Sequence, residues 1–204
     1  YSYRIIPDRG SWLEVQFDVN DLIYIYLDRR RRRRKFLITT FLKAMGYETN
    51  EEILSAAHQG RVSSMSVAEL LKAEGLENYY TVEDVADGAG TVVAAALVSL
   101  NETLLKSIQD AGVKAVKVVH VPDGDNYLIL CLRKDPSKNH EDALKEVYKR
   151  MRPGDPPSIV NAKQLLKRLF FDVRRYDLGE VGRFKINQKL KLGIDEKGIA
   201  RRRI

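Results

Sequence analysis

Hydrophobic and polar residues alternate near the start of the chain in a pattern that predicts a β-hairpin. One face of the first strand carries Leu13, Val15 and Phe17, and the other carries Trp12, Glu14, Gln16 and Asp18. A period of two is typical of a strand with one buried face. Residues 19–21 supply a turn, since Asn and Asp tolerate left-handed backbone. The return strand, residues 22–27, then places Ile23, Ile25 and Leu27 on one face.

Strict alternation puts Trp12, the single tryptophan of the chain, on the polar face of this hairpin. Two interpretations follow from that position. The ring can cap the edge of a core, because tryptophan is rarely buried completely. It can also stand exposed as a platform on which a nucleic-acid base stacks, because a run of cations comes after the hairpin. The pattern alone leaves both interpretations open.

The remainder of the chain alternates between helical and strand-like patterns. Residues 36–45 have helical spacing, and capping boxes at 49–52, 66–69 and 177–180 predict three helix starts. Further helices are expected after residue 99, over 139–151 and after Ser158. The predicted strands cover residues 79–85, 92–98, 113–121 and 126–132, the last returning after a turn at 122–125.

These elements predict an α+β fold in two parts. A β-hairpin and several helices form a discontinuous core from residues 1–59 and 133–204. Residues 60–132 form a small, variable α+β subdomain inserted between them.

The basic charge of the chain is concentrated in one run. The formal net charge is +7, and residues 29–35 are seven consecutive cations, so the rest of the chain is neutral. Such a block is either a solvated segment or a site for a polyanion. The second is favoured, because seven adjacent cations repel one another unless an anion is near. A nucleic acid is the expected partner.

The sequence lacks the motifs that are typical of catalytic sites. His58, His120 and His140 lack the spacing of metal ligands, and the single Cys131 lies in an apolar run. Ser11 lacks the G-x-S-x-G context of a nucleophile, and no glycine loop precedes a Lys-Ser or Lys-Thr pair. We therefore expect no catalytic, metal or cofactor site in this chain. The single cysteine and the absence of an apolar membrane span or signal peptide indicate a reducing cytosol. Because the sequence starts without Met, we expect a piece of a larger protein.

Four runs of the sequence resemble one family in that family's own order. They are RIIPDRGSWLEVQFD at 4–18, DRRR at 28–31, MRPGDPPS at 151–158 and FFDVRRYDLGEVGRFKIN at 170–187. Each is similar to the lobe, or second Rpb2-type domain, of the bacterial DNA-directed RNA polymerase β subunit. The basic run is longer than the family pattern, and Leu37 stands where the family has proline. We therefore assign no individual contact to Arg32, Arg33 or Arg34.

The resemblance implies a function for the chain within a nucleotidyltransferase of transcription. The lobe would form one pincer of the DNA cleft and guide the downstream duplex and the non-template strand. The implied partners are DNA and the β′, α and sigma subunits, in the bacterial cytoplasm and without a membrane. Magnesium would be held by the partner β′ subunit. The implied nucleic-acid-binding residues are Trp12, Asp28, Arg29, Arg30, Arg31, Arg152 and Arg183.

Two other functions compete with this interpretation. A free-standing, arginine-rich module for single-stranded nucleic acid would account for the basic run. A protein-interaction platform would account for the mixture of acidic and apolar residues at 69–98. An exposed apolar patch in that region would favour the platform.

Overall fold

A computed structural model describes residues 2–27, 35–58, 60–122 and 124–193. The chain folds into two compact units, and the α+β class predicted from the sequence is confirmed. The first unit comprises Tyr1–Ala44 and Pro136–Ile204, and the second comprises Met45–Asp135. The inserted unit is therefore longer at both ends than the predicted 60–132. One reason is that Glu51, on the helix preceding residue 60, accepts a hydrogen bond of 3.0 Å from Lys117 inside the insertion.

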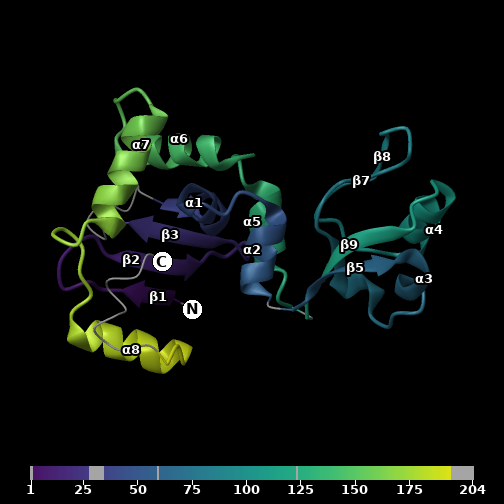
Figure 1. Ribbon diagram of the computed structural model, residues 1–204, viewed down its shortest axis with the longest axis horizontal. Helices are drawn as coiled ribbons and strands as arrows, with labels where there is room; N and C mark the ends of the chain where they lie inside the picture. Colours follow the sequence, from purple (N-terminus) through teal and green to yellow (C-terminus); the bar gives the residue numbers. More distant parts are fainter. Residues whose placement is uncertain (1, 28–34, 59, 123, 194–204) are drawn as a thin grey trace. The chain divides into compact units, whose positions relative to one another are not determined.

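The first unit is built on a four-stranded antiparallel sheet in the order β1-β2-β3-β4 (Figure 1). The predicted hairpin is confirmed as β2 and β3, with Val15 opposite Ile25. Its turn contains Asp21 in left-handed backbone, with φ of 59°. The strands are β1 (Ser2–Ile5), β2 (Leu13–Phe17), β3 (Ile23–Leu27) and β4 (Lys35–Leu37).

Burial follows the predicted alternation in β3 but departs from it in β2. Ile23, Ile25 and Leu27 are buried, as predicted. On β2, however, Glu14 is only 9% exposed and Phe17 is 42% exposed. The outer strand β1 explains Glu14, because Arg4 lies opposite it and donates a hydrogen bond of 2.6 Å to its carboxylate. Phe17 lies at the hairpin end of the strand, which β1 does not reach.

Helices complete the first unit around this sheet. Figure 1 shows α6 and α7 on the β3 side of the sheet and α8 beside the outer strand β1. Phe41 of α1 meets Phe170 edge to face, with ring centroids 5.7 Å apart, which ties α1 to the end of the α7 segment. The elements are α1 (Ile38–Met45), α6 (His140–Met151), α7 (Ile159–Leu166), the π-helical turn η2 (Lys167–Phe171) and α8 (Glu180–Leu190).

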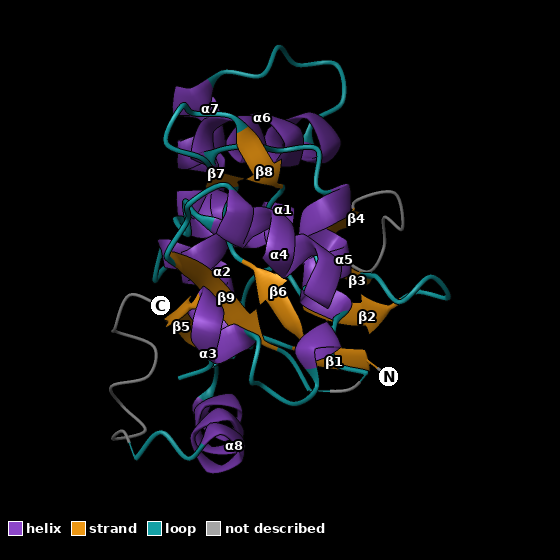
Figure 2. Ribbon diagram, turned by 90° about the vertical axis from the view of Figure 1, so that its right-hand side faces the viewer, coloured by secondary structure: helices purple, strands orange, loops and turns teal. Residues whose placement is uncertain are grey.

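The second unit has its own core beneath a three-stranded sheet in the order β5-β9-β6, drawn in orange in Figure 2. The predicted capping boxes of Thr49 with Glu52 and of Ser66 with Glu69 are confirmed. The strands are β5 (Val62–Ser66), β6 (Tyr79–Thr81), β7 (Val85–Ala86), β8 (Val92–Ala94) and β9 (Ala115–His120). The helices are α2 (Asn50–Ala57), α3 (Val67–Leu70), η1 (Leu76–Asn78), α4 (Glu102–Asp110) and α5 (Tyr127–Lys134).

The predicted strand at residues 126–132 is wrong, because this segment forms helix α5. A short apolar run does not distinguish a strand from a buried helix by its period. The sheet supplies the physical reason for the outcome. Strand β9 already pairs with β5 on one side and β6 on the other, so it has no free edge for a returning strand. The helix instead buries Ile129, Cys131 and Leu132.

Within the described ranges, every helix is too short or too polar to cross a lipid bilayer.

Candidate nucleic-acid interface

The loop that leads to Trp12 is clamped against a loop from the far end of the sequence. Backbone N–H groups of Asp8 and Arg9 donate to the carbonyl of Asp177 at 2.9 and 3.2 Å, and the N–H of Asp177 donates back to Arg9 at 2.9 Å. The Arg9 guanidinium also donates to the carbonyl of Arg174 at 3.1 Å. These four bonds fix residues 8–10 against residues 174–177.

Gly10 is required at the centre of this clamp. Its backbone has φ of +124°, which disfavours any side chain, and a Cβ would lie 2.7 Å from Cδ2 of Tyr176. The Tyr176 ring in turn packs edge to face on Phe170, with centroids 5.7 Å apart. Burial raises the pKa of the Tyr176 phenol, because the charged phenolate is disfavoured away from water. The clamp is therefore anchored in the packed part of the unit.

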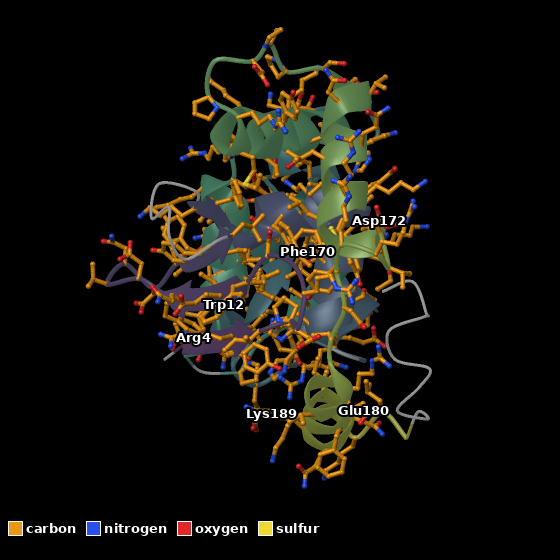
Figure 3. All side chains as sticks on the ribbon, turned by 90° about the vertical axis from the view of Figure 1, so that its left-hand side faces the viewer. Arg4, Trp12, Phe170, Asp172, Glu180 and Lys189 are labelled. Atoms are coloured by element: carbon orange, nitrogen blue, oxygen red, sulfur yellow. The ribbon has the colours of Figure 1, made fainter. Side chains whose placement is uncertain are left out.

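Trp12 lies two residues beyond Gly10 and immediately before β2. The residue is 37% exposed, so part of it remains accessible to a ligand. Strand β2 is an inner strand of the sheet, and Figure 3 shows Trp12 near Arg4 of the neighbouring strand β1. The indole is thus attached to a braced segment, which limits the entropy lost on stacking.

The predicted contacts Asp28, Arg29, Arg30 and Arg31 lie outside the described residues. Their flanks are described: β3 ends at Leu27, and β4 begins at Lys35 opposite Tyr26. The Lys35 ammonium, the last cation of the run, lies 4.4 Å from the centre of the Tyr24 ring.

Arg183 makes an intramolecular ion pair. Its Nη2 lies 2.5 Å from Oδ1 of Asp177, and its side chain is 18% exposed. This contact explains why the predicted capping box at 177–180 is wrong. The carboxylate of Asp177 serves Arg183, and α8 begins after Gly179 with no side-chain cap. Arg183 thereby fastens α8 to the clamped loop that carries Asp177.

Arg152 ends helix α6 at the start of the proline-rich turn. Its Nη1 lies 3.7 Å from the Asp155 carboxylate, and more than half of its side chain is exposed. The segment from Ile159 to Phe171 separates it from the clamp, a length of about 20 Å at helical rise. The structure therefore links the loop before Trp12 to Arg183 through Asp177, whereas Arg152 lies in a hollow lined by α7.

The sequence reasoning missed Arg174 and Arg175, which project from the clamped loop. Arg174 is 92% exposed and Arg175 is 63% exposed. Both guanidinium groups lie near Asp172, at 3.7 and 3.4 Å. The signal for them in the sequence is the Arg-Arg pair itself, which lies inside the run at 170–187.

The chemistry available to this surface is non-covalent binding. Exposed guanidinium groups attract phosphates, and an exposed indole offers a stacking plane. Among the described residues, no three His, Cys, Asp or Glu side chains are grouped to hold a metal ion.

Comparisons with known proteins identify the family of the chain. The family described as RNA polymerase Rpb2, domain 2, matches residues 125–202. The chain is 46% identical over 96% of its length to the DNA-directed RNA polymerase subunit beta of Methylacidiphilum infernorum. It is 42% identical over 98% of its length to the same subunit of Chlamydia trachomatis, and 43% identical over 96% to that of Protochlamydia amoebophila.

The chain belongs to the RNA polymerase β-subunit family. It spans 16% of the length of each of these relatives. The resemblance of the four sequence runs is thereby confirmed. The clamp between the RGSW loop and the loop at 172–177 joins two of those runs.

Proposed function

We propose that this chain is the lobe of a bacterial RNA polymerase β subunit and holds the non-template strand in the DNA cleft. In this proposal the lobe is one pincer of the cleft, and it also borders the downstream duplex. The β′, α and sigma subunits complete the enzyme, which works on DNA in the cytoplasm. The clamp carries the proposal, because it braces a partly exposed tryptophan beside a loop with two exposed arginines.

Two interactions, phosphate neutralisation and base stacking, would hold a melted strand at this surface. Each phosphate neutralised by Lys or Arg releases condensed counterions, which gives binding that tolerates any sequence and weakens with salt. Stacking on Trp12 would add about 1–3 kcal/mol for one base. A strand held in this way is kept from its complement while the template enters the active site.

Nucleotidyl transfer would take place elsewhere in the proposed enzyme. Magnesium would supply the charge that stabilises the transferring phosphoryl group, and we assign its ligands to the β′ subunit. In this proposal the contribution of this chain is to position the DNA.

The emission of Trp12 tests the proposal, because the chain has no other tryptophan. Single-stranded oligothymidine is titrated at low and moderate salt. We expect quenching that weakens with salt and that is reduced in the triple variant Arg29→Gln, Arg30→Gln, Arg31→Gln. The matched control neutralises three exposed lysines of other segments, as Lys72→Gln, Lys106→Gln, Lys138→Gln.

The control must retain most of the quenching if the arginines act locally. Equal loss in both triple variants would attribute binding to net charge alone. An accessible Trp12 with no quenching at any salt would contradict the stacking role.

A further inference from the structure

A surface along helix α7 has the composition of a second binding site for single-stranded nucleic acid. Between residues 152 and 175 the chain has six cations and two carboxylates. Both carboxylates are already paired, Asp155 with Arg152 and Asp172 with Arg174 and Arg175. In the described structure no carboxylate forms an ion pair with Lys163, Lys167 or Arg168. Three of the four uncompensated positive charges therefore belong to α7 and η2, and the fourth is shared by Arg174 and Arg175, which have only Asp172 between them.

The cations occupy the outer side of the helix. Ala162 and Leu166 face inward and are buried, at 2% and 5% exposed. Lys163, Lys167 and Arg168 are exposed. Figure 3 shows this helix, in light green, leading down to Asp172.

Two neighbouring hollows line this side of the helix, and we call them together the track. The first, of about 220 Å³, lies between Arg152 and α7. The second, of about 400 Å³, lies between α7 and Arg174. They share Gln164 and Arg168 as lining residues, so the two hollows lie next to each other along α7, one reaching Arg152 and the other Arg174.

The track also offers groups that suit bases. Phe171 lines the second hollow and is 39% exposed, so part of the residue is accessible to a base. Asn161 and Gln164 line the first hollow with amides that can donate and accept hydrogen bonds. The helix widens to a π-helical turn at Lys167–Phe171, and such turns are rare and are frequent at functional sites.

We propose that this track, formed by Arg152, Gln164, Lys167, Arg168, Phe171 and Arg174, binds single-stranded nucleic acid. Phosphates lie against Lys167, Arg168 and Arg174, and one base stacks on Phe171. An acidic protein segment would also form ion pairs with these cations, but its carboxylates would not stack on the exposed ring of Phe171. The inference rests on the proposed function for the class of ligand and extends it to residues outside the Trp12 clamp.

The test compares oligothymidine binding by the whole chain and by the variant Lys167→Gln, Arg168→Gln, Arg174→Gln. Anisotropy of labelled oligothymidine gives the affinity from about 50 to about 200 mM salt. Each phosphate contact to a single strand contributes about 0.7 to the slope of log affinity against log salt, so we expect the slope to fall in magnitude by about 2. The control Lys72→Gln, Lys106→Gln, Lys138→Gln makes the same change in net charge, and its slope should stay near that of the parent chain. Equal slopes for the two triple variants would overturn the proposal.

The variant Phe171→Leu separates nucleic acid from an acidic protein segment, because leucine keeps the apolar contact and removes the stacking plane. We expect it to weaken oligothymidine binding several-fold and to leave displacement by poly-glutamate unchanged. If poly-glutamate displaces oligothymidine at equal charge concentration, and Phe171→Leu has no effect, the track is a site for acidic protein and our assignment is wrong.

Trp12 emission distinguishes failure of this inference from failure of the proposed function. A salt slope that falls as expected while oligothymidine leaves Trp12 unquenched would support the track and contradict the stacking role of Trp12. Quenching of Trp12 with an unchanged salt slope in the variant Lys167→Gln, Arg168→Gln, Arg174→Gln would support the stacking role of Trp12 and contradict the track.

Discussion

Gly10→Ala is expected to open the clamp that braces Trp12. The new Cβ would lie 2.7 Å from Tyr176 Cδ2 and 3.0 Å from the carbonyl oxygen of Arg175, and the second contact is with backbone. The alanine must also adopt φ of +124° or shift the loop. Either response strains the bonds between residues 8–9 and Asp177.

The loss of stability can be estimated from these contacts. A side chain held in an unfavourable backbone region costs about 1–3 kcal/mol. Displacing the Tyr176 ring removes its edge-to-face contact with Phe170, which is worth about 0.5–1.5 kcal/mol. We therefore expect Gly10→Ala to lower the free energy of unfolding of the first unit by about 2–4 kcal/mol.

A matched control is available in the same unit. Gly154 has φ of +106°, and a Cβ there would meet nothing within 4 Å. Gly154→Ala thus carries the backbone strain without the clash. Urea denaturation, followed by circular dichroism and Trp12 emission, measures both variants.

The difference between the two variants reports the clamp. We expect Gly10→Ala to be the more destabilised by about 1 kcal/mol or more and to change the Trp12 emission of the folded protein. Equal destabilisation of the two variants, within about 0.5 kcal/mol, with unchanged Trp12 emission would refute the packing of Gly10 on Tyr176.

Three further changes test the supporting contacts. Asp177→Asn should cost about 1–2 kcal/mol by weakening the pair with Arg183, and a double-mutant cycle with Arg183→Ala checks it, since additive effects would exclude the pair. Because the pKa of Tyr176 is raised in the folded protein, Tyr176 contributes stability that is fully present below the ordinary tyrosine pKa and is lost as pH rises through the pKa of the folded state. Between about pH 9 and pH 11 the parent chain should therefore lose more stability than the variant Tyr176→Phe. Parallel pH curves from urea midpoints would contradict this assignment. Ser66→Ala should lower stability by about 1 kcal/mol and return the lowered pKa of Glu69 toward its ordinary value, as followed by carboxyl NMR, and an unmoved titration would show that the capping box does not hold Glu69.

Sequence patterns predicted correctly the elements that depend on residues close together in the chain. The hairpin of β2 and β3 followed from period-two alternation and an Asn-Asp turn, and two capping boxes followed from residues three positions apart. Helix α5 could not be predicted in this way, because its apolar run fits both periods. Only the sheet order shows that both edges of β9 are occupied.

The candidate site was predictable only in part for the same reason. Trp12 was selected by its place in an alternating strand next to cations. The clamp joins Arg9 to Arg174, residues separated by 165 positions, and no pattern along the sequence encodes that contact. Arg183 illustrates the difference most clearly. Its sequence run resembled a family contact to DNA, whereas its guanidinium is engaged by Asp177 within the chain.

The central claim is that Trp12 faces a melted non-template strand, and crosslinking tests it most directly. A photoreactive phenylalanine analogue replaces Trp12 in the intact polymerase, which is then bound to a promoter with each strand labelled separately. Our account predicts a crosslink to the non-template strand that appears when the duplex melts and is absent from closed complexes. A crosslink to the template strand, or to protein alone in the melted complex, would contradict it.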